Sequence, residues 1–107
     1  MKIPSILKVG AARYRVKYEK EAFVATDDPK GEAENVGEHV PCLRIIRLSK
    51  RSHHKKIPEE SMADTFLHEA LHAVSRVYGI DLKESQVSGL AGGLMQVIRD
   101  NGLDFRA

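Results

Sequence analysis

The chain has 107 residues, of which 42% are hydrophobic and 30% are charged, and its formal net charge at pH 7 is +2. This length predicts one domain, residues 1–107, with a single modest core. No apolar run approaches the roughly 18 residues of a membrane helix, and the N-terminal segment lacks the form of a signal peptide. We therefore expect a cytoplasmic protein that does not act at a membrane, and the small net charge argues against nucleic acid as its main partner.

The first part of the chain has the pattern of β-strands. Residues 12–19 alternate strictly between apolar or aromatic side chains and charged ones, which is typical of a half-buried strand. Residues 6–9 precede this segment across Gly10, so the two segments predict an antiparallel β-hairpin.

The middle of the chain is less regular. Residues 23–25 predict a short strand, and residues 26–41 are rich in Asp, Gly, Pro, Glu and Asn without a sustained period, which predicts a long loop. This loop either faces the substrate or is simply mobile. Residues 42–49 return to strand character, and the basic residues 50–56 that follow are expected to be solvated.

Residues 58–79 have the pattern of an amphipathic helix. Pro58 suits the first helical position, acidic residues follow in the first turn, and Gly79 suits the position after the last turn. Apolar pairs recur between them at helical spacing and form a broad apolar face. The middle of this helix carries the sequence His-Glu-Ala-Leu-His, residues 68–72.

The spacing of this motif is that of a zinc site on a helix. His68 and His72 lie one turn apart on the same face, so both imidazole rings can bind one ion. Glu69 projects about 100° around the helix, where it can act as the general base for a water molecule held by the metal. The alternative is a pair of histidines at the edge of the core that bind no metal. Cys42 is the only cysteine, so any ion must be held by histidine and carboxylate groups.

A second helical pattern runs to about Asn101, with Gly102 placed to cap it. The short connection predicts that the two helices are antiparallel neighbours. Gly89, Gly92 and Gly93 interrupt this helix, and we expect their small surface to let the motif helix approach closely. The predicted apolar stripe of this helix consists of Val87, Leu90, Ala91, Leu94, Val97 and Ile98.

A catalytic zinc site takes three protein ligands, so a third donor is needed. Glu84 is the preferred candidate, because it lies at the head of the inward stripe of the second helix. The alternative role for Glu84 is to cap this helix in a pair with Asp81. His39 is isolated in the predicted loop and carries no signal of its own. The other candidate ligands are Asp64, Asp81, His53 and His54.

The residues around the motif and in the second helix resemble the small zincin-like proteins encoded by bacteriophages and prophages. These proteins are related in plan to the ImmA/IrrE and, more distantly, the SprT-like metallopeptidases. The similarity covers about half of the chain, residues 65–74 and 81–101. It implies an α+β fold, a minimal zincin-like domain with an N-terminal β-hairpin, a further strand and two antiparallel helices. It also implies one Zn²⁺ bound by His68, His72 and a glutamate, with Glu69 as the base. One departure is that the ligand glutamate of ImmA/IrrE-type proteins corresponds to Ser88, one turn after Glu84.

The function expected from these features is a zinc metallopeptidase, an endopeptidase that acts on a protein or peptide substrate. The strand that ends near Ser49 is a plausible sheet edge for an extended substrate. The alternative is a catalytically inactive, zinc-bound protein-interaction module of phage or prophage origin. A third possibility, a nucleic-acid binder, depends on the basic residues 50–56 alone. The sequence leaves the physiological substrate and the oligomeric state open.

Overall fold

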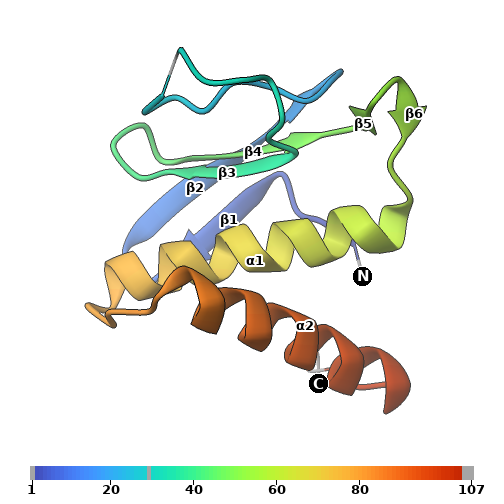
Figure 1. Cartoon of the computed structure of the whole chain (residues 1–107). Coiled ribbons are helices and arrows are strands. Elements are labelled where there is room, and N and C mark those ends of the chain that lie inside the picture. The colour runs from blue at the N-terminus through green and yellow to red at the C-terminus, as the bar shows by residue number, and fades with distance from the viewer. Residues whose placement is uncertain (1, 29, 105–107) are drawn as a thin grey trace.

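The computed structural model describes residues 2–28 and 30–104, and its fold is α+β, as the sequence predicts. Figure 1 shows a sheet, helix α1 (Glu59–Val77) across one face of it, and helix α2 (Glu84–Asp100) on the far side of α1. The His-Glu-Ala-Leu-His motif is in α1, the middle layer. No helix in the described part of the chain is long and apolar enough to cross a membrane.

Strands β1 (Ile6–Val9) and β2 (Ala12–Glu19) form the predicted antiparallel hairpin. Gly10 has a φ of +56° in the turn, a conformation that glycine adopts without steric cost. The period-2 alternation of β2 buries Ala12 and Tyr14 in the core, while the charged residues between them stay exposed. The hairpin therefore supplies one half of the sheet against which α1 packs.

Strand β3 (Gly37–Val40) lies inside the segment predicted to be a loop, so that prediction is wrong for its last part. It pairs antiparallel with β4 (Ile45–Ser49), which pairs parallel with β2, and the order in the sheet is β1-β2-β4-β3. β4 begins later than predicted, because residues 41–44 form a turn. Val40 is the only buried side chain of β3, too little for a recognisable alternation. The edge strands of the sheet are therefore β1 and β3, and the expectation of an edge at the strand ending near Ser49 is wrong.

Two smaller segments also differ from the sequence-based expectation. Phe23 forms only an isolated bridge with Asn35 instead of a strand over residues 23–25. The basic segment before α1 folds into a short hairpin of the two-residue strands β5 (Arg51–Ser52) and β6 (Lys55–Lys56).

Helix α1 follows the prediction closely. Pro58 is its N-cap residue, and Gly79, with a φ of +66°, follows its C-cap. Phe66, Ala70 and Ala73 on one face are buried in the core against the sheet. Because this packing fixes the rotation of α1, it also fixes the direction in which the two motif histidines project.

Helix α2 packs against α1 in the predicted antiparallel orientation (Figure 1). The predicted apolar stripe divides into two faces, of which only one is buried. The residues buried on this face are Val87, Ala91 and Met95. The residues exposed on the other face are Leu90, Leu94 and Val97.

The expected close approach of a second backbone at the glycines of α2 is wrong. A Cβ atom built at Gly89, Gly92 or Gly93 meets no atom within 4 Å in the described part of the chain. Each position therefore has room for a methyl group, including Gly92, which borders a hollow between the two helices, so these glycines do not determine how closely the helices approach.

We therefore expect Gly89→Ala, Gly92→Ala and Gly93→Ala to stabilise the protein. Each should raise the free energy of unfolding by up to about 1 kcal/mol, because alanine loses less backbone entropy than glycine in a helix. Urea titration followed by circular dichroism measures the change. Gly37→Ala is the matched control and should destabilise, since its Cβ would lie 2.3 Å from Thr65 Cγ2. Destabilisation by all three helical substitutions would contradict the exposed position of these glycines.

Candidate metal centre

His68 and His72 project from one face of α1, one turn apart, as the spacing predicts. Their Nε2 atoms are 3.2 Å apart, and both side chains are partly buried. The rings meet edge to face, with centroids 5.0 Å apart. Both nitrogens are therefore directed at the same small volume beside the helix.

Glu84, the first residue of α2, places its carboxylate at this volume. Its Oε1 lies 2.7 Å from His68 Nε2, and its Oε2 lies 2.8 Å from His72 Nε2. The predicted alternative, a cap formed by Asp81 and Glu84, is wrong. Lys83 is the N-cap residue, and its backbone N–H donates to Gln86 Oε1 at 2.8 Å. Glu84 is consequently free to face the two histidines.

The turn between the helices sets the position of Glu84. Ser75 near the end of α1 donates a hydrogen bond to the carbonyl of Ile80, and its hydroxyl accepts one from the N–H of Leu82 at 3.3 Å. The N–H of Ile80 also donates to the carbonyl of Ser75 at 2.9 Å. These bonds hold the start of α2 against the last turns of α1.

The three side chains fit the requirements of a zinc ion. Two imidazole nitrogens and a carboxylate oxygen are a known catalytic donor set, and the ligand atoms here all lie within 4.8 Å of one another. Among the described residues, no other histidine, cysteine, aspartate or glutamate belongs to a group of this kind. The other candidates, Asp64, Asp81, His53 and His54, are therefore outside the ligand group, and so is the exposed Ser88.

Glu69 lies beside this group and is buried, with 8% of its surface exposed. Strand β3 passes directly over it: a Cβ at Gly37 would lie 3.1 Å from Glu69 Oε2 as well as against Thr65. The backbone of His39 hydrogen-bonds the Glu69 carboxyl. Only a residue without a side chain at position 37 lets the strand approach the helix this closely.

The pKa of Glu69 is raised to about 7, mainly because the carboxyl group is buried, and the nearby carboxylates of Glu84 and Glu38 act in the same direction. His68 and the backbone hydrogen bond from His39 act in the opposite direction. A carboxyl group with this pKa can both take up and release a proton near neutral pH.

His39 is a site residue that the sequence did not identify. It projects from β3, its Nε2 lies 3.1 Å from the hydroxyl of the buried Tyr14, and its ring is parallel to that of His72 at 6.4 Å. Burial lowers the pKa of His39 to about 4, with help from the positive charges of His72 and Arg76. Its only sequence signal is its place in a four-residue strand that carries too few apolar residues to be recognised.

The group lines a cavity of about 710 Å³ whose walls come from both α1 and β3. Residues 25–27 of the segment before β3 form another part of the wall, so the first part of the predicted loop does face the site. The side chains of His68, Glu69, His72 and Glu84 all line this one cavity.

The two shifted pKa values predict opposite pH dependences for the stability of the metal-free protein. Glu69 binds a proton more tightly in the folded state, so its contribution is present below about pH 4.5 and is lost as the pH rises through about 7. His39 binds a proton less tightly when folded, so its contribution is present above about pH 6.5 and is lost as the pH falls toward about 4.

Urea titrations with a chelator present test both assignments. The Glu69→Gln variant keeps only the contribution of His39, so its free energy of unfolding should rise from about pH 4 to 6.5. The His39→Asn variant keeps only the contribution of Glu69, so its free energy of unfolding should fall from about pH 4.5 to 7. The expected size is on the order of 2 kcal/mol for Glu69 and 1 kcal/mol for the less buried His39. Profiles for both variants that coincide with the wild-type profile would contradict these assignments.

Comparison of the chain with family models, with curated proteins and with solved structures finds no match. The chemical interpretation of the site therefore depends on its donor atoms, its buried carboxyl group and its cavity.

Proposed function

We propose that the protein is a zinc-dependent metallopeptidase with a zincin-like site. The observation that carries this proposal is the meeting of His68, His72 and Glu84 at one point, with the buried Glu69 lining the same cavity. A ligand group of two histidines and one carboxylate leaves a fourth position for water or substrate. The base and the two histidine ligands come from one helix, and the first residue of the next helix supplies the third ligand, which supports a catalytic function over a chance cluster.

When bound, Zn²⁺ supplies a Lewis acid that polarises the scissile carbonyl group and acidifies a water molecule. Glu69 takes the proton from this water as it attacks the carbonyl carbon, and later delivers the proton to the leaving amine.

The sheet edge beside the site is suited to an extended peptide. The N–H of Ser49 donates to the carbonyl of Val36 at 2.8 Å, so alternate residues of β3 pair with β4, while Gly37 and His39 between them direct their backbone groups away from β4. The backbone of His39 already hydrogen-bonds Glu69, so a substrate strand would pair through the remaining groups of this edge. A substrate strand that pairs with this edge lies over the cavity, with its scissile bond beside the ligand group. We therefore place the substrate on β3 and not on β4.

The second candidate function is a zinc-bound protein-interaction module without catalytic activity. The exposed apolar face of α2, formed by Leu90, Leu94 and Val97, favours it, since a partner protein could cover these side chains. This function predicts that zinc is retained but that no peptide bond is hydrolysed.

The deciding experiment measures the zinc content of the purified protein and its hydrolysis of a peptide library, followed by mass spectrometry. A metallopeptidase should contain one zinc per chain, cleave specific peptides, lose activity with a chelator and regain it with added Zn²⁺. Zinc at this ratio without cleavage would instead support the interaction module. Absence of zinc even after incubation with the ion would contradict both functions.

A further inference from the structure

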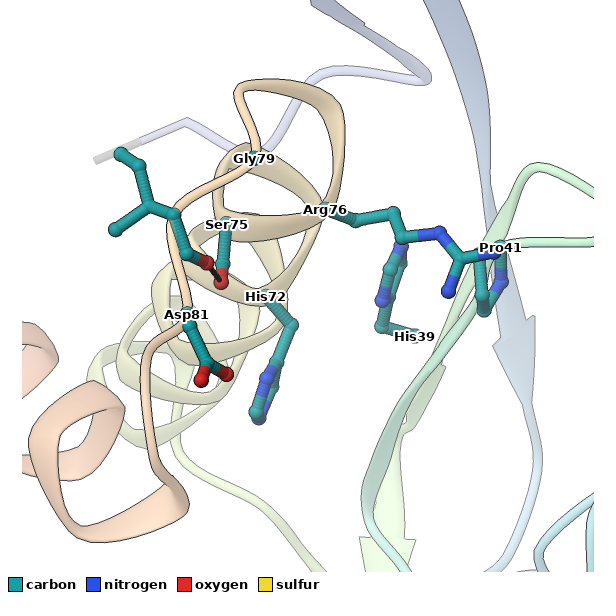
Figure 2. Close-up of a pocket in the computed structure, with 8 residues that line it drawn as sticks. His39, Pro41, His72, Ser75, Arg76, Gly79 and Asp81 are labelled. Atoms are coloured by element: carbon teal, nitrogen blue, oxygen red, sulfur yellow. Dashed lines mark hydrogen bonds between the residues drawn. The ribbon is translucent and has the colours of Figure 1, made fainter.

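A second, shallower depression of about 430 Å³ adjoins the cavity of the ligand group. The two hollows share His39, Pro41 and His72, so a peptide bound along β3 would extend from one into the other. The remaining lining residues come from the end of α1 and from the turn before α2, as Figure 2 shows.

Arg76 provides the positive charge of this depression. It lies one helical turn after His72, and Figure 2 shows its side chain extending away from the helix toward Pro41, beside the ring of His39. Among the described residues, the guanidinium group forms no ion pair and no hydrogen bond. A cation in the last helical turn ordinarily interacts with the terminal carbonyl groups. Arg76 is instead directed across the depression, and its charge lowers the pKa of His39.

Asp81 lies on the other side of the depression. In Figure 2 its carboxylate is beside His72 on the side of the turn that leads to α2, away from β3. In the described part of the chain it has no ion pair either. The depression therefore has a positive wall next to the strand and a negative wall next to the turn, and a peptide on β3 would lie against the positive wall.

We propose that Arg76 is a specificity-determining residue that binds a carboxylate group of the peptide substrate. This inference depends on the proposed function and adds the class of substrate. One helical turn advances about 5.4 Å, and an extended peptide advances roughly 3.3 Å per residue, so the carboxylate belongs one or two residues from the scissile bond. An unpaired guanidinium group is suited to this role because it can form two parallel hydrogen bonds with a carboxylate.

Two sources can supply this carboxylate, and they differ in the direction of the bound peptide. β3 runs from Gly37, beside Glu69, toward Pro41, in the depression of Arg76. A peptide antiparallel to β3 would present an acidic side chain on the N-terminal side of the scissile bond. A parallel peptide would present an acidic side chain, or the free C-terminal carboxylate, on the C-terminal side.

The test starts from a peptide that the zinc-loaded wild type cleaves. Matched peptides carry Glu or Gln at each of the two positions on either side of the bond, with a free or an amidated C-terminus. We expect kcat/KM to be roughly tenfold higher for the carboxylate at one of these places, and this ratio should fall with added salt. The position that shows the preference identifies the source: a side chain before the bond, a side chain after it, or the chain terminus.

Four variants assign the preference to Arg76. Arg76→Gln should reduce the ratio to about one, and Arg76→Lys should restore part of it. Arg13→Gln, which removes the same charge from an exposed position on β2, should leave the ratio intact. Asp81→Asn should raise the ratio, because it removes a repelling charge. Equal rates for all matched peptides, or a ratio that Arg76→Gln leaves unchanged, would overturn the proposal.

A binding measurement separates this inference from the proposed function. N-acetylglutamate amide, a probe for an acidic side chain, should shift the NMR signal of the Arg76 Nε–H group at concentrations where N-acetylglutamine amide does not. N-acetylglycine, a probe for a C-terminal carboxylate, is compared with its amide in the same way. A shift without hydrolysis of any peptide would refute the peptidase and keep the carboxylate site. Hydrolysis without any carboxylate-dependent shift would refute the site and keep the peptidase.

Discussion

Glu69→Gln is expected to abolish peptide hydrolysis while leaving the zinc content unchanged. The amide has nearly the shape of the carboxyl group, so it fits the same buried position under β3, but it cannot take a proton from water. General bases contribute roughly 10²- to 10⁴-fold to enzymatic rates, and we expect a fall in kcat near the upper end of this range. Peptide cleavage followed by mass spectrometry, together with metal analysis of the same preparation, measures both quantities.

The matched control is Glu59→Gln, which changes an exposed glutamate in the first turn of the same helix. It should keep full activity. A Glu69→Gln protein that cleaves within a few-fold of the wild-type rate would show that another group activates the water. A Glu69→Gln protein that loses zinc would instead show that this carboxylate is a ligand, contrary to the geometry of the site.

The second large effect is expected for zinc affinity. His68→Ala, His72→Ala and Glu84→Gln should each weaken zinc binding by at least about 100-fold, because even the partners that orient metal ligands are worth 10- to 100-fold. Competition with a chelator of known affinity measures this loss. Because Glu84 belongs to α2 and the histidines belong to α1, zinc should also raise the melting temperature of the wild type, and Glu84→Gln should remove most of that rise.

His53→Ala and Asp81→Asn are the matched controls for these variants, since neither residue belongs to the ligand group. Both proteins should bind zinc as tightly as the wild type. Unchanged affinity in Glu84→Gln, combined with weaker binding in Asp81→Asn or Asp64→Asn, would show that the third ligand is misassigned.

The motif helix and its histidines were predictable because their signals are local. The period of 3.6 residues places His68 and His72 on one face whatever the rest of the chain does, and Pro58 and Gly79 mark the helix ends. Glu84 was predictable for a related reason. It stands three residues before Val87 and seven before Ala91, on the stripe that the second helix turns toward the first.

The strand over the site was not predictable, because its position depends on tertiary pairing. Gly37 and His39 belong to a strand whose only buried side chain is Val40, and the strand is held by hydrogen bonds to β4 and not by an apolar pattern. The sequence also could not show which of the apolar residues of α2 are buried. Leu90 and Leu94 share the helical period with the buried residues, so the periodicity alone does not show which face contacts α1.

The glycine at position 37 affects the protonation of Glu69 through the path of the backbone. The missing methyl group there permits the strand to exclude water from the carboxyl group of residue 69. A larger amino acid would push the strand outward, hydrate that acid and return its protonation equilibrium toward the value of a free glutamate. Acid–base tuning in this molecule is thus set by a neighbouring segment of the chain, and evolutionary change at the glycine would alter reactivity without touching any group that reacts.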